Sequence, residues 1–245
     1  MITMSNLGNN GRLGNQLFQF AFLFGLSKAK GYDFCIPPNT DLLNCFDIDC
    51  KIAEFKPKVV GRLNKNHNIT LERAFEYDQN FPNFSDNADY SGYYQTEKYF
   101  KHCKSELIQS LKFKEKSKIP VNIDSKDLVS IHVRRGDYVG NKYHPVVGMN
   151  YINEAKKIFP NKKFMVFSDD IEWCKHNNVG DCYAENKNHY VDLYQMTLCS
   201  GSIIANSSFS WWGAYLGGGK VVAPKDWFRS IVVPRDIYCE GWEIL

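Results

Sequence analysis

The chain has 245 residues, of which 44% are hydrophobic and 23% are charged. This length suffices for one large domain or two small ones, each with its own core. The net charge of +3 is too small an excess to indicate a nucleic-acid-binding protein. No stretch approaches the ~18 consecutive apolar residues of a membrane span, and the N-terminus carries no pattern of an export signal. We therefore expect a cytoplasmic protein with no integral membrane segment and with reduced cysteines.

The N-terminal part of the chain predicts the beginning of an α/β unit. Residues 11–30 open with glycines and run into apolar residues that mostly share one helical face. A short strand is expected over 32–36, where two prolines stop it. Residues 39–110 mix short apolar pieces with many polar residues and predict no clear elements. Residues 107–118 are interpreted as the end of a helix that leads into a polar connector.

After residue 127 short apolar runs alternate with amphipathic segments. We expect strands at 128–133, 163–167, 202–205 and 220–224, and helices at 151–159, from 171, at 192–199 and after the turn at 206–208. This alternation predicts a parallel, doubly wound sheet. The polar connector at 114–127 is the expected domain boundary, which gives an N-terminal domain over 1–124 and a C-terminal domain over 125–245.

The first candidate site lies in Gly11–Gln16, a loop with the sequence GRLGNQ that enters the first predicted helix. Glycines let the backbone approach a ligand closely, and a helix N-terminus offers N–H groups to an anion or a sugar. An ordinary glycine turn explains the same spacing equally well, because the segment matches neither the P-loop nor the dinucleotide-binding pattern.

The second candidate is His132–Tyr138, with the sequence HVRRGDY, at the expected end of a buried strand. Ligands bind at such strand ends in open α/β sheets. Alternation along the strand directs His132 and Arg134 to one side, away from Val133. An arginine there can clamp a diphosphate with two parallel hydrogen bonds, whereas a salt bridge to an aspartate would make it structural. The adjacent arginines at this position favour the anion site.

The third candidate is the run Ser168, Asp169 and Asp170, which follows another predicted strand. Paired carboxylates can hold a divalent metal or accept hydrogen bonds from a base or a ribose. Ser168 or Asp169 can equally cap the helix expected from residue 171. We expect one aspartate to cap this helix and the other to recognise a nucleotide.

The fourth candidate is the strand-to-helix turn Asn206–Gly213, with the sequence NSSFSWWG. Its hydroxyl and amide groups at a helix N-terminus can form an anion cradle that the helix dipole strengthens. Simple N-capping is the alternative. Trp211 and Trp212 are interpreted as core residues rather than as a platform for a sugar.

The four segments together resemble motifs of the α-1,2-fucosyltransferases, a family 11-like group of glycosyltransferases. They occur in the family's order over most of the chain, and the H-x-R-R-G-D-Y element is the most specific of them. The resemblance implies an α/β fold of GT-B type, with two Rossmann-like domains facing a cleft. It also implies inverting transfer of L-fucose from GDP-fucose to a sugar hydroxyl, expected to be the 2-OH of a terminal galactose. No metal and no cofactor besides the co-substrate GDP-fucose are expected.

The resemblance further implies roles for particular residues. The C-terminal domain is expected to bind the donor and the N-terminal domain to serve the acceptor. The arginine on the diphosphate falls on Arg134 or Arg135, and His132 and Asp170 are expected to read guanine. The full set expected to contact GDP-fucose is Gly14, Asn15, Gln16, His132, Arg134, Arg135, Asp169, Asp170, Asn206, Ser207, Ser208 and Ser210.

Arg134, Arg135 and Asp137 are the candidate catalytic residues. Asp137 is either the base that takes the proton of the acceptor hydroxyl or a partner that holds the arginines, and a highly dissociative transition state would need no base at all. Asp47-Ile48-Asp49 resembles the D-x-D of metal-dependent glycosyltransferases but is interpreted as a surface turn. A transferase for another nucleotide sugar or acceptor, and a sugar-binding protein without turnover, are the alternative functions.

Overall fold

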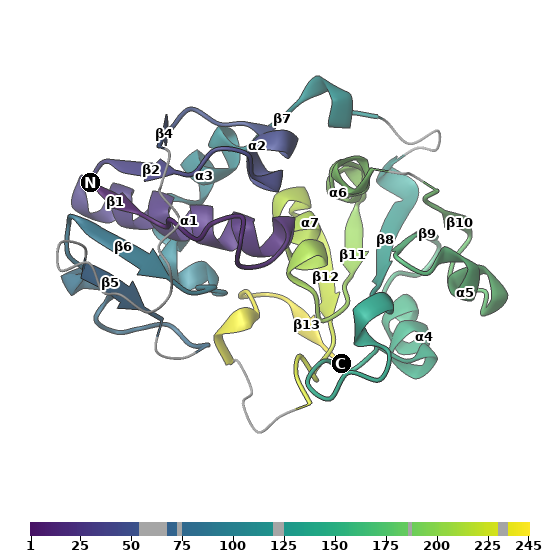
Figure 1. Cartoon of the computed structure of the whole chain (residues 1–245). Helices are drawn as coiled ribbons and strands as arrows, with labels where there is room; N and C mark the ends of the chain where they lie inside the picture. Colours follow the sequence, from purple (N-terminus) through teal and green to yellow (C-terminus); the bar gives the residue numbers. More distant parts are fainter. Residues whose placement is uncertain (54–67, 73–74, 120–124, 186–187, 230–234) are drawn as a thin grey trace. The chain divides into compact units, whose positions relative to one another are not determined.

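The computed structural model describes residues 1–53, 68–72, 75–119, 125–185, 188–229 and 235–245 (Figure 1). The chain forms two compact units. Unit 1 comprises Met1–Lys114 with Arg235–Ile237, and unit 2 comprises Glu115–Pro234 with Tyr238–Leu245. The domain boundary expected between residues 124 and 125 falls at the edge of 120–124, which lie outside the described residues.

In the described part of unit 2, six parallel strands form one sheet in the order β10-β9-β8-β11-β12-β13. The strands are β8 (Leu128–Val133), β9 (Lys163–Ser168), β10 (Cys182–Tyr183), β11 (Gly201–Ile203), β12 (Lys220–Ala223) and β13 (Glu243–Ile244). The helices between them are α4 (Met149–Lys157), α5 (Ile171–His176), α6 (His189–Leu198) and α7 (Ser208–Gly217). This order is that of a doubly wound sheet, so the expected α/β architecture is confirmed.

The alternation of side chains along β8 divides the core of unit 2 between the two faces of its sheet. Every residue of β8 is buried. Val129, Ile131 and Val133 pack with residues of α4 and α5 on one face, while Phe167 packs with residues of α6 and α7 on the other. His132 points to this second face and lies near Phe209, with 5.7 Å between the ring centroids. The expected orientation of His132 away from Val133 is therefore confirmed.

Unit 1 contains a parallel sheet of described strands in the order β4-β2-β1-β6-β5. Its strands are β1 (Ile2–Thr3), β2 (Phe34–Ile36), β4 (Lys51–Ile52), β5 (Asn68–Leu71) and β6 (Ala88–Ser91), and β3 (Phe46–Asp47) pairs separately with β7 (Lys112–Phe113). The helices are α1 (Leu13–Lys30), α2 (Asp41–Cys45) and α3 (Lys104–Ser110). The helix expected over 107–118 is wrong beyond Ser110, because the chain turns there and enters β7.

Short 3-10 turns join these elements. They lie at Phe81–Asn83, Glu97–Tyr99, Lys101–Cys103, Glu115–Ser117, Ser125–Asp127, Gly136–Tyr138 and Arg235–Ile237. Among the described residues, no helix has the length and apolar character needed to cross a membrane. The expected cytoplasmic location stays a prediction.

Candidate active site

The candidate site of unit 2 lies where the strand order reverses. β8 has β9 on one side and β11 on the other, so the carboxyl ends of β8 and β11 border the switch point at which doubly wound sheets bind ligands. Arg134 and Asp137 follow β8, and Asn206 follows β11. Tyr138 joins the two segments, because its hydroxyl donates to the carbonyl oxygen of Asn206 at 3.2 Å.

Both arginines of the second motif are held by carboxylates. Arg134 donates through Nη2 to Asp137 and through Nη1 to Oδ2 of Asp169, the latter at 2.8 Å. Arg135 donates through Nε to Asp170 at 2.9 Å, and its guanidinium stacks 4.1 Å from the ring centroid of Trp173. The structural salt bridge weighed from the sequence is therefore present at both positions.

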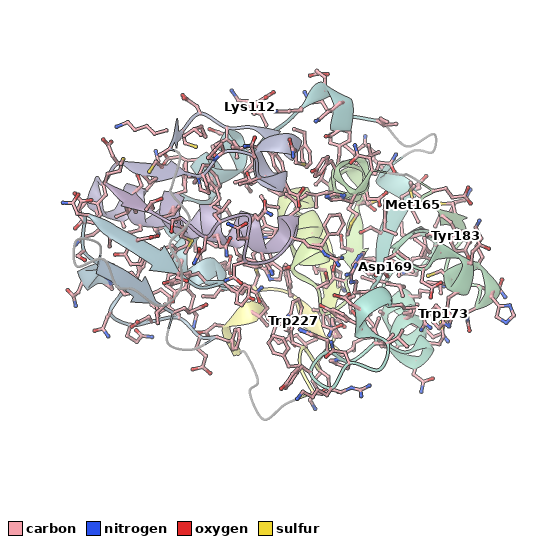
Figure 2. The ribbon with its side chains drawn as sticks, in the orientation of Figure 1. Lys112, Met165, Asp169, Trp173, Tyr183 and Trp227 are labelled. Carbon is pink, nitrogen blue, oxygen red and sulfur yellow. The ribbon has the colours of Figure 1, made fainter. Side chains whose placement is uncertain are left out.

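The two arginines differ in what surrounds them. Arg135 lies against Trp173 on the first turn of α5, and Figure 2 labels Trp173 and Asp169 on the segment where β9 leads into that helix. Arg134 instead lies over the ring of Tyr138, 5.6 Å from its centroid. Because Tyr138 reaches the turn after β11, Arg134 is the arginine that borders the switch point.

Asp170 is the residue that caps α5. Its Oδ1 accepts from the backbone N–H of Trp173 at 3.2 Å while its Oδ2 accepts from Arg135, and this hydrogen bond lowers the pKa of the Asp170 carboxyl. The cap expected at Ser168 or Asp169 is therefore wrong, whereas the expectation that one aspartate of the pair caps this helix is confirmed by Asp170. Ser168 accepts from the backbone N–H of Asp170 at 2.9 Å, which shapes the turn before the helix.

Asp169 is packed tightly between the two arginines. Its Oδ1 accepts from the backbone N–H of Arg135 at 2.8 Å while its Oδ2 binds Arg134. A Cβ on Gly136 would lie 2.5 Å from the same Oδ2, so only glycine leaves room for this carboxylate. Neither aspartate of the predicted pair is directed to a nucleotide by these contacts, and their roles as base or ribose contacts stay predictions.

His132 is buried on the α6 and α7 face of the sheet. Its Nδ1 has no hydrogen-bond partner among the described residues. Burial lowers the pKa of His132 to about 4, so the imidazole is neutral near pH 7. A neutral ring with an unpaired buried nitrogen suits a hydrogen bond to an uncharged nucleotide base better than a charge contact to a phosphate.

The burial of His132 makes stability depend on pH. The folded-state pKa of about 4 lies below the ordinary value of 6.5, so the unfolded chain binds more protons between these two values. The free energy of unfolding should therefore fall by about 3 kcal/mol as the pH drops from about 6.5 to about 4. Urea unfolding of the protein and of His132→Gln across this range tests it. Parallel pH profiles for the two proteins would contradict the assignment.

The turn after β11 is built largely from its own hydrogen bonds. Ser207 caps α7, and Ser210 donates to the carbonyl oxygens of Ala205 and Ser207 at 3.3 and 3.2 Å. Asn206 is buried and donates to the carbonyl oxygen of Trp227 at 3.0 Å. Four residues of this turn are predicted to contact the donor. Of these, Ser208, at the first position of α7, is half-buried and the other three are buried. These bonds preorganise the helix N-terminus, and nucleotide contacts by the four residues stay predictions.

The predicted loop of unit 1 lies at the carboxyl end of β1, where α1 begins. Gly11 has φ +98°, and a Cβ there would lie 2.1 Å from Nδ2 of Asn15, so glycine is required by the loop itself. Gln16 is buried, donates to the carbonyl oxygen of Gly11 at 3.2 Å and accepts from the N–H of Leu42 at 3.0 Å. Gly14 is buried beside them. Donor contacts by Gly14, Asn15 and Gln16 stay predictions.

Sequence reasoning gave no role to Tyr138 or Trp173, which complete the surroundings of the arginines. Tyr138 stacks on His144 with 4.6 Å between ring centroids, and His144 in turn lies 5.2 Å from Phe228. Trp173 stands three residues after Asp170, a spacing that returns a side chain to the same helix face and so toward the strand end. This spacing can be read from the sequence. The sequence alone does not show that Arg135 lies within reach of the helix.

In the part of the chain that the structure describes, no group of three or more His, Cys, Asp or Glu side chains could hold a metal ion. Asp47 and Asp49 are exposed, and Asp47 lies 3.8 Å from the ammonium of Lys114. These observations agree with the interpretation of Asp47–Asp49 as a surface segment, but the expected turn is wrong for Asp47, which belongs to strand β3.

Comparisons with known proteins extend the resemblance to the whole chain. The family model of glycosyl transferase family 11 matches residues 1–245. An alpha-1,2-colitosyltransferase of Escherichia coli is 32% identical, over 89% of this chain and 90% of that protein. The galactoside alpha-(1,2)-fucosyltransferase 2 of Bos taurus is 27% identical, over 95% of this chain and 76% of that protein.

Solved structures with lower sequence identity to this chain share its fold. The NodZ alpha-1,6-fucosyltransferase soaked with GDP-fucose aligns with a TM-score of 0.53 at 12% identity, over 88% of this chain and 92% of that chain. POFUT1 in complex with GDP aligns with a TM-score of 0.51 at 12% identity, over 91% of this chain and 98% of that chain. The expected GT-B-type α/β fold is thereby confirmed. The chain belongs to glycosyl transferase family 11 and is a glycosyltransferase similar to the galactoside α-1,2-fucosyltransferases.

Proposed function

We propose that this protein transfers L-fucose from GDP-fucose to the 2-OH of a terminal galactose, with inversion at the anomeric carbon. The observation that carries the proposal is Arg134, a guanidinium held at the switch point between β8 and β11 by two carboxylates and a tyrosine ring. That is the place for a leaving diphosphate in a doubly wound sheet. The fucosyltransferase of Bos taurus supports the sugar, and both relatives named above support the α-1,2 linkage.

The geometry suits catalysis by electrostatic stabilisation. As the bond between the anomeric carbon and the phosphate oxygen breaks, negative charge grows on the diphosphate, and a preorganised guanidinium stabilises that charge more in the transition state than in the ground state. The acceptor oxygen attacks from the opposite face, so the β-linked donor gives an α-fucoside. In this proposal unit 2 binds the donor, with guanine near His132, and unit 1 serves the acceptor.

A second donor has specific support. The relative at 32% identity is a colitosyltransferase, which makes colitose, the 3-deoxy counterpart of fucose, the second candidate for the sugar that this protein moves. The two sugars differ by one hydroxyl. A site built to hydrogen-bond that hydroxyl rejects the analogue that lacks it strongly, whereas an apolar site discriminates little. A non-catalytic sugar-binding protein is disfavoured, because a lectin has no need for an arginine that receives a diphosphate.

The test is a donor panel with product analysis. Purified protein is incubated with GDP-fucose, GDP-colitose or UDP-galactose and a set of galactosides, in excess EDTA, and free nucleotide and linkage are measured. We expect release of GDP, an α-1,2-linked product and activity that EDTA does not remove. Turnover with UDP-galactose and with no guanine nucleotide sugar would reject the proposed donor. Loss of activity in EDTA that Mn²⁺ or Mg²⁺ restores would indicate that the acidic pairs bind a metal ion.

A further inference from the structure

Arg134 and Arg135 already have carboxylate partners before any donor binds. Two guanidinium groups, Arg134 and Arg135, are contacted by the three carboxylates of Asp137, Asp169 and Asp170. The neutral imidazole of His132 adds no positive charge. A diphosphate brings further negative charge, and like charges at contact distance repel. A donor can therefore engage Arg134 well only if one carboxylate leaves it.

The two carboxylates on Arg134 differ in their exposure to solvent. Asp169 is bound at both oxygens, by the backbone N–H of Arg135 and by Arg134, and it is packed against Gly136. Its side chain is 26% exposed, whereas that of Asp137 is 57% exposed. Asp137 also sits on the 3-10 turn Gly136–Tyr138, only three residues from its arginine. Asp137 is therefore the partner that a phosphate oxygen can replace at Nη2 of Arg134.

We propose that the donor diphosphate displaces Asp137 from Arg134 and that the displaced carboxylate then serves as the base for the acceptor hydroxyl. The proposal rests on the proposed function. Asp137 thus occupies the phosphate position in the free enzyme and becomes basic toward the acceptor only when the donor is bound.

The transfer step balances without any further reactant. The acceptor oxygen forms a bond to the anomeric carbon of fucose while the bond from that carbon to the β-phosphate oxygen breaks, and the bonding electron pair leaves with GDP. The hydroxyl proton passes to the carboxylate of Asp137 and from there to solvent. When GDP departs, Asp137 returns to Nη2 of Arg134.

The proposal predicts two opposite effects in a single variant, namely tighter binding of GDP and a lower kcat. Asp137→Asn removes a competitor for Arg134, so GDP should bind about two- to fivefold more tightly, the range of a solvent-exposed ion pair. The same variant loses the base, so kcat should fall by about 10² or more. Asp137→Ala should shift both quantities in the same directions. Asp169→Asn is the matched control, because it removes the fixed partner and should weaken GDP binding about tenfold.

Calorimetry with GDP and initial-rate kinetics measure these effects, and urea unfolding confirms that each variant is folded. Wild-type protein that neither binds GDP nor transfers fucose would reject the proposed function itself. If the wild type does both, weaker or unchanged GDP binding by both Asp137 variants overturns the displacement and leaves Asp137 as a support of Arg134. Unchanged kcat in Asp137→Asn overturns its role as base.

Discussion

Replacing Arg134 with alanine is expected to lower kcat by about 10²–10³, the loss found when one preorganised charge-stabilising group is removed. Arg134 borders the switch point, and both of its Nη atoms are directed by carboxylates. Without it the growing charge on the diphosphate meets Asp169 with no cation between them. GDP affinity should fall as well, but by less than kcat, because the stabilisation is greatest in the transition state.

Arg134→Lys should fail almost as fully. A lysine ammonium is a single point charge, and it cannot bind Asp169 and a phosphate through two separate N–H groups in one plane. Arg135→Ala is the informative comparison. Arg135 is bound to Asp170 and stacked on Trp173, so its loss should act mainly by loosening the segment that positions Asp169, with a smaller fall in kcat.

Single-turnover and steady-state kinetics of the three variants, with exposed Arg229→Ala as a surface control, measure this ranking. An Arg134→Ala protein with wild-type kcat would remove Arg134 from the mechanism. A larger loss in Arg135→Ala than in Arg134→Ala would show that the diphosphate lies on the α5 side of β8 rather than at the switch point.

The sheet of unit 2 was predictable because burial on both faces makes parallel strands nearly continuous apolar runs. β8 and β12 fall within a residue of their expected bounds for this reason. The turn at Asn206–Ser208 was also predictable, since polar residues of this kind cap helices whatever the surrounding fold. In unit 1, by contrast, several strands of the sheet are only two or three residues long. Strands so short leave no periodic pattern to detect.

The pairing of Arg134 with Asp169 was not predictable from the sequence, whereas its pairing with Asp137 was one of the alternatives stated for that aspartate. Arg134 and Asp169 are brought together by the parallel register of β8 and β9, in which Val133 lies beside Ser168. Nothing in either segment alone specifies that register. The identity of the helix cap was missed for a related reason: Ser168, Asp169 and Asp170 are all good caps, and Arg135 contributes to the choice by binding the carboxylate that starts α5.

The tryptophan pair of the fourth motif belongs to the core of unit 2. Trp211 and Trp212 are completely buried, which confirms their interpretation as core residues. Trp212 packs edge to face on Tyr215, with 5.5 Å between ring centroids and 78° between planes. Trp211 stacks on the same tyrosine at 4.6 Å and contacts Trp242 at 5.4 Å. These rings anchor α7, whose first turn carries the serines expected at the nucleotide.

Trp212→Ala should therefore lower the free energy of unfolding by about 3–5 kcal/mol, because it leaves a large cavity that the packed helix cannot close. Trp212→Phe keeps an aromatic ring in place and should cost clearly less. Tyr143, an exposed aromatic residue, is the matched control, and Tyr143→Ala should stay within about 0.5 kcal/mol of the wild type. Urea unfolding measures all three. A sugar platform would behave in the opposite way: Trp212→Ala would keep its stability and raise the KM for the acceptor, and that result would move Trp212 from the core to the binding surface.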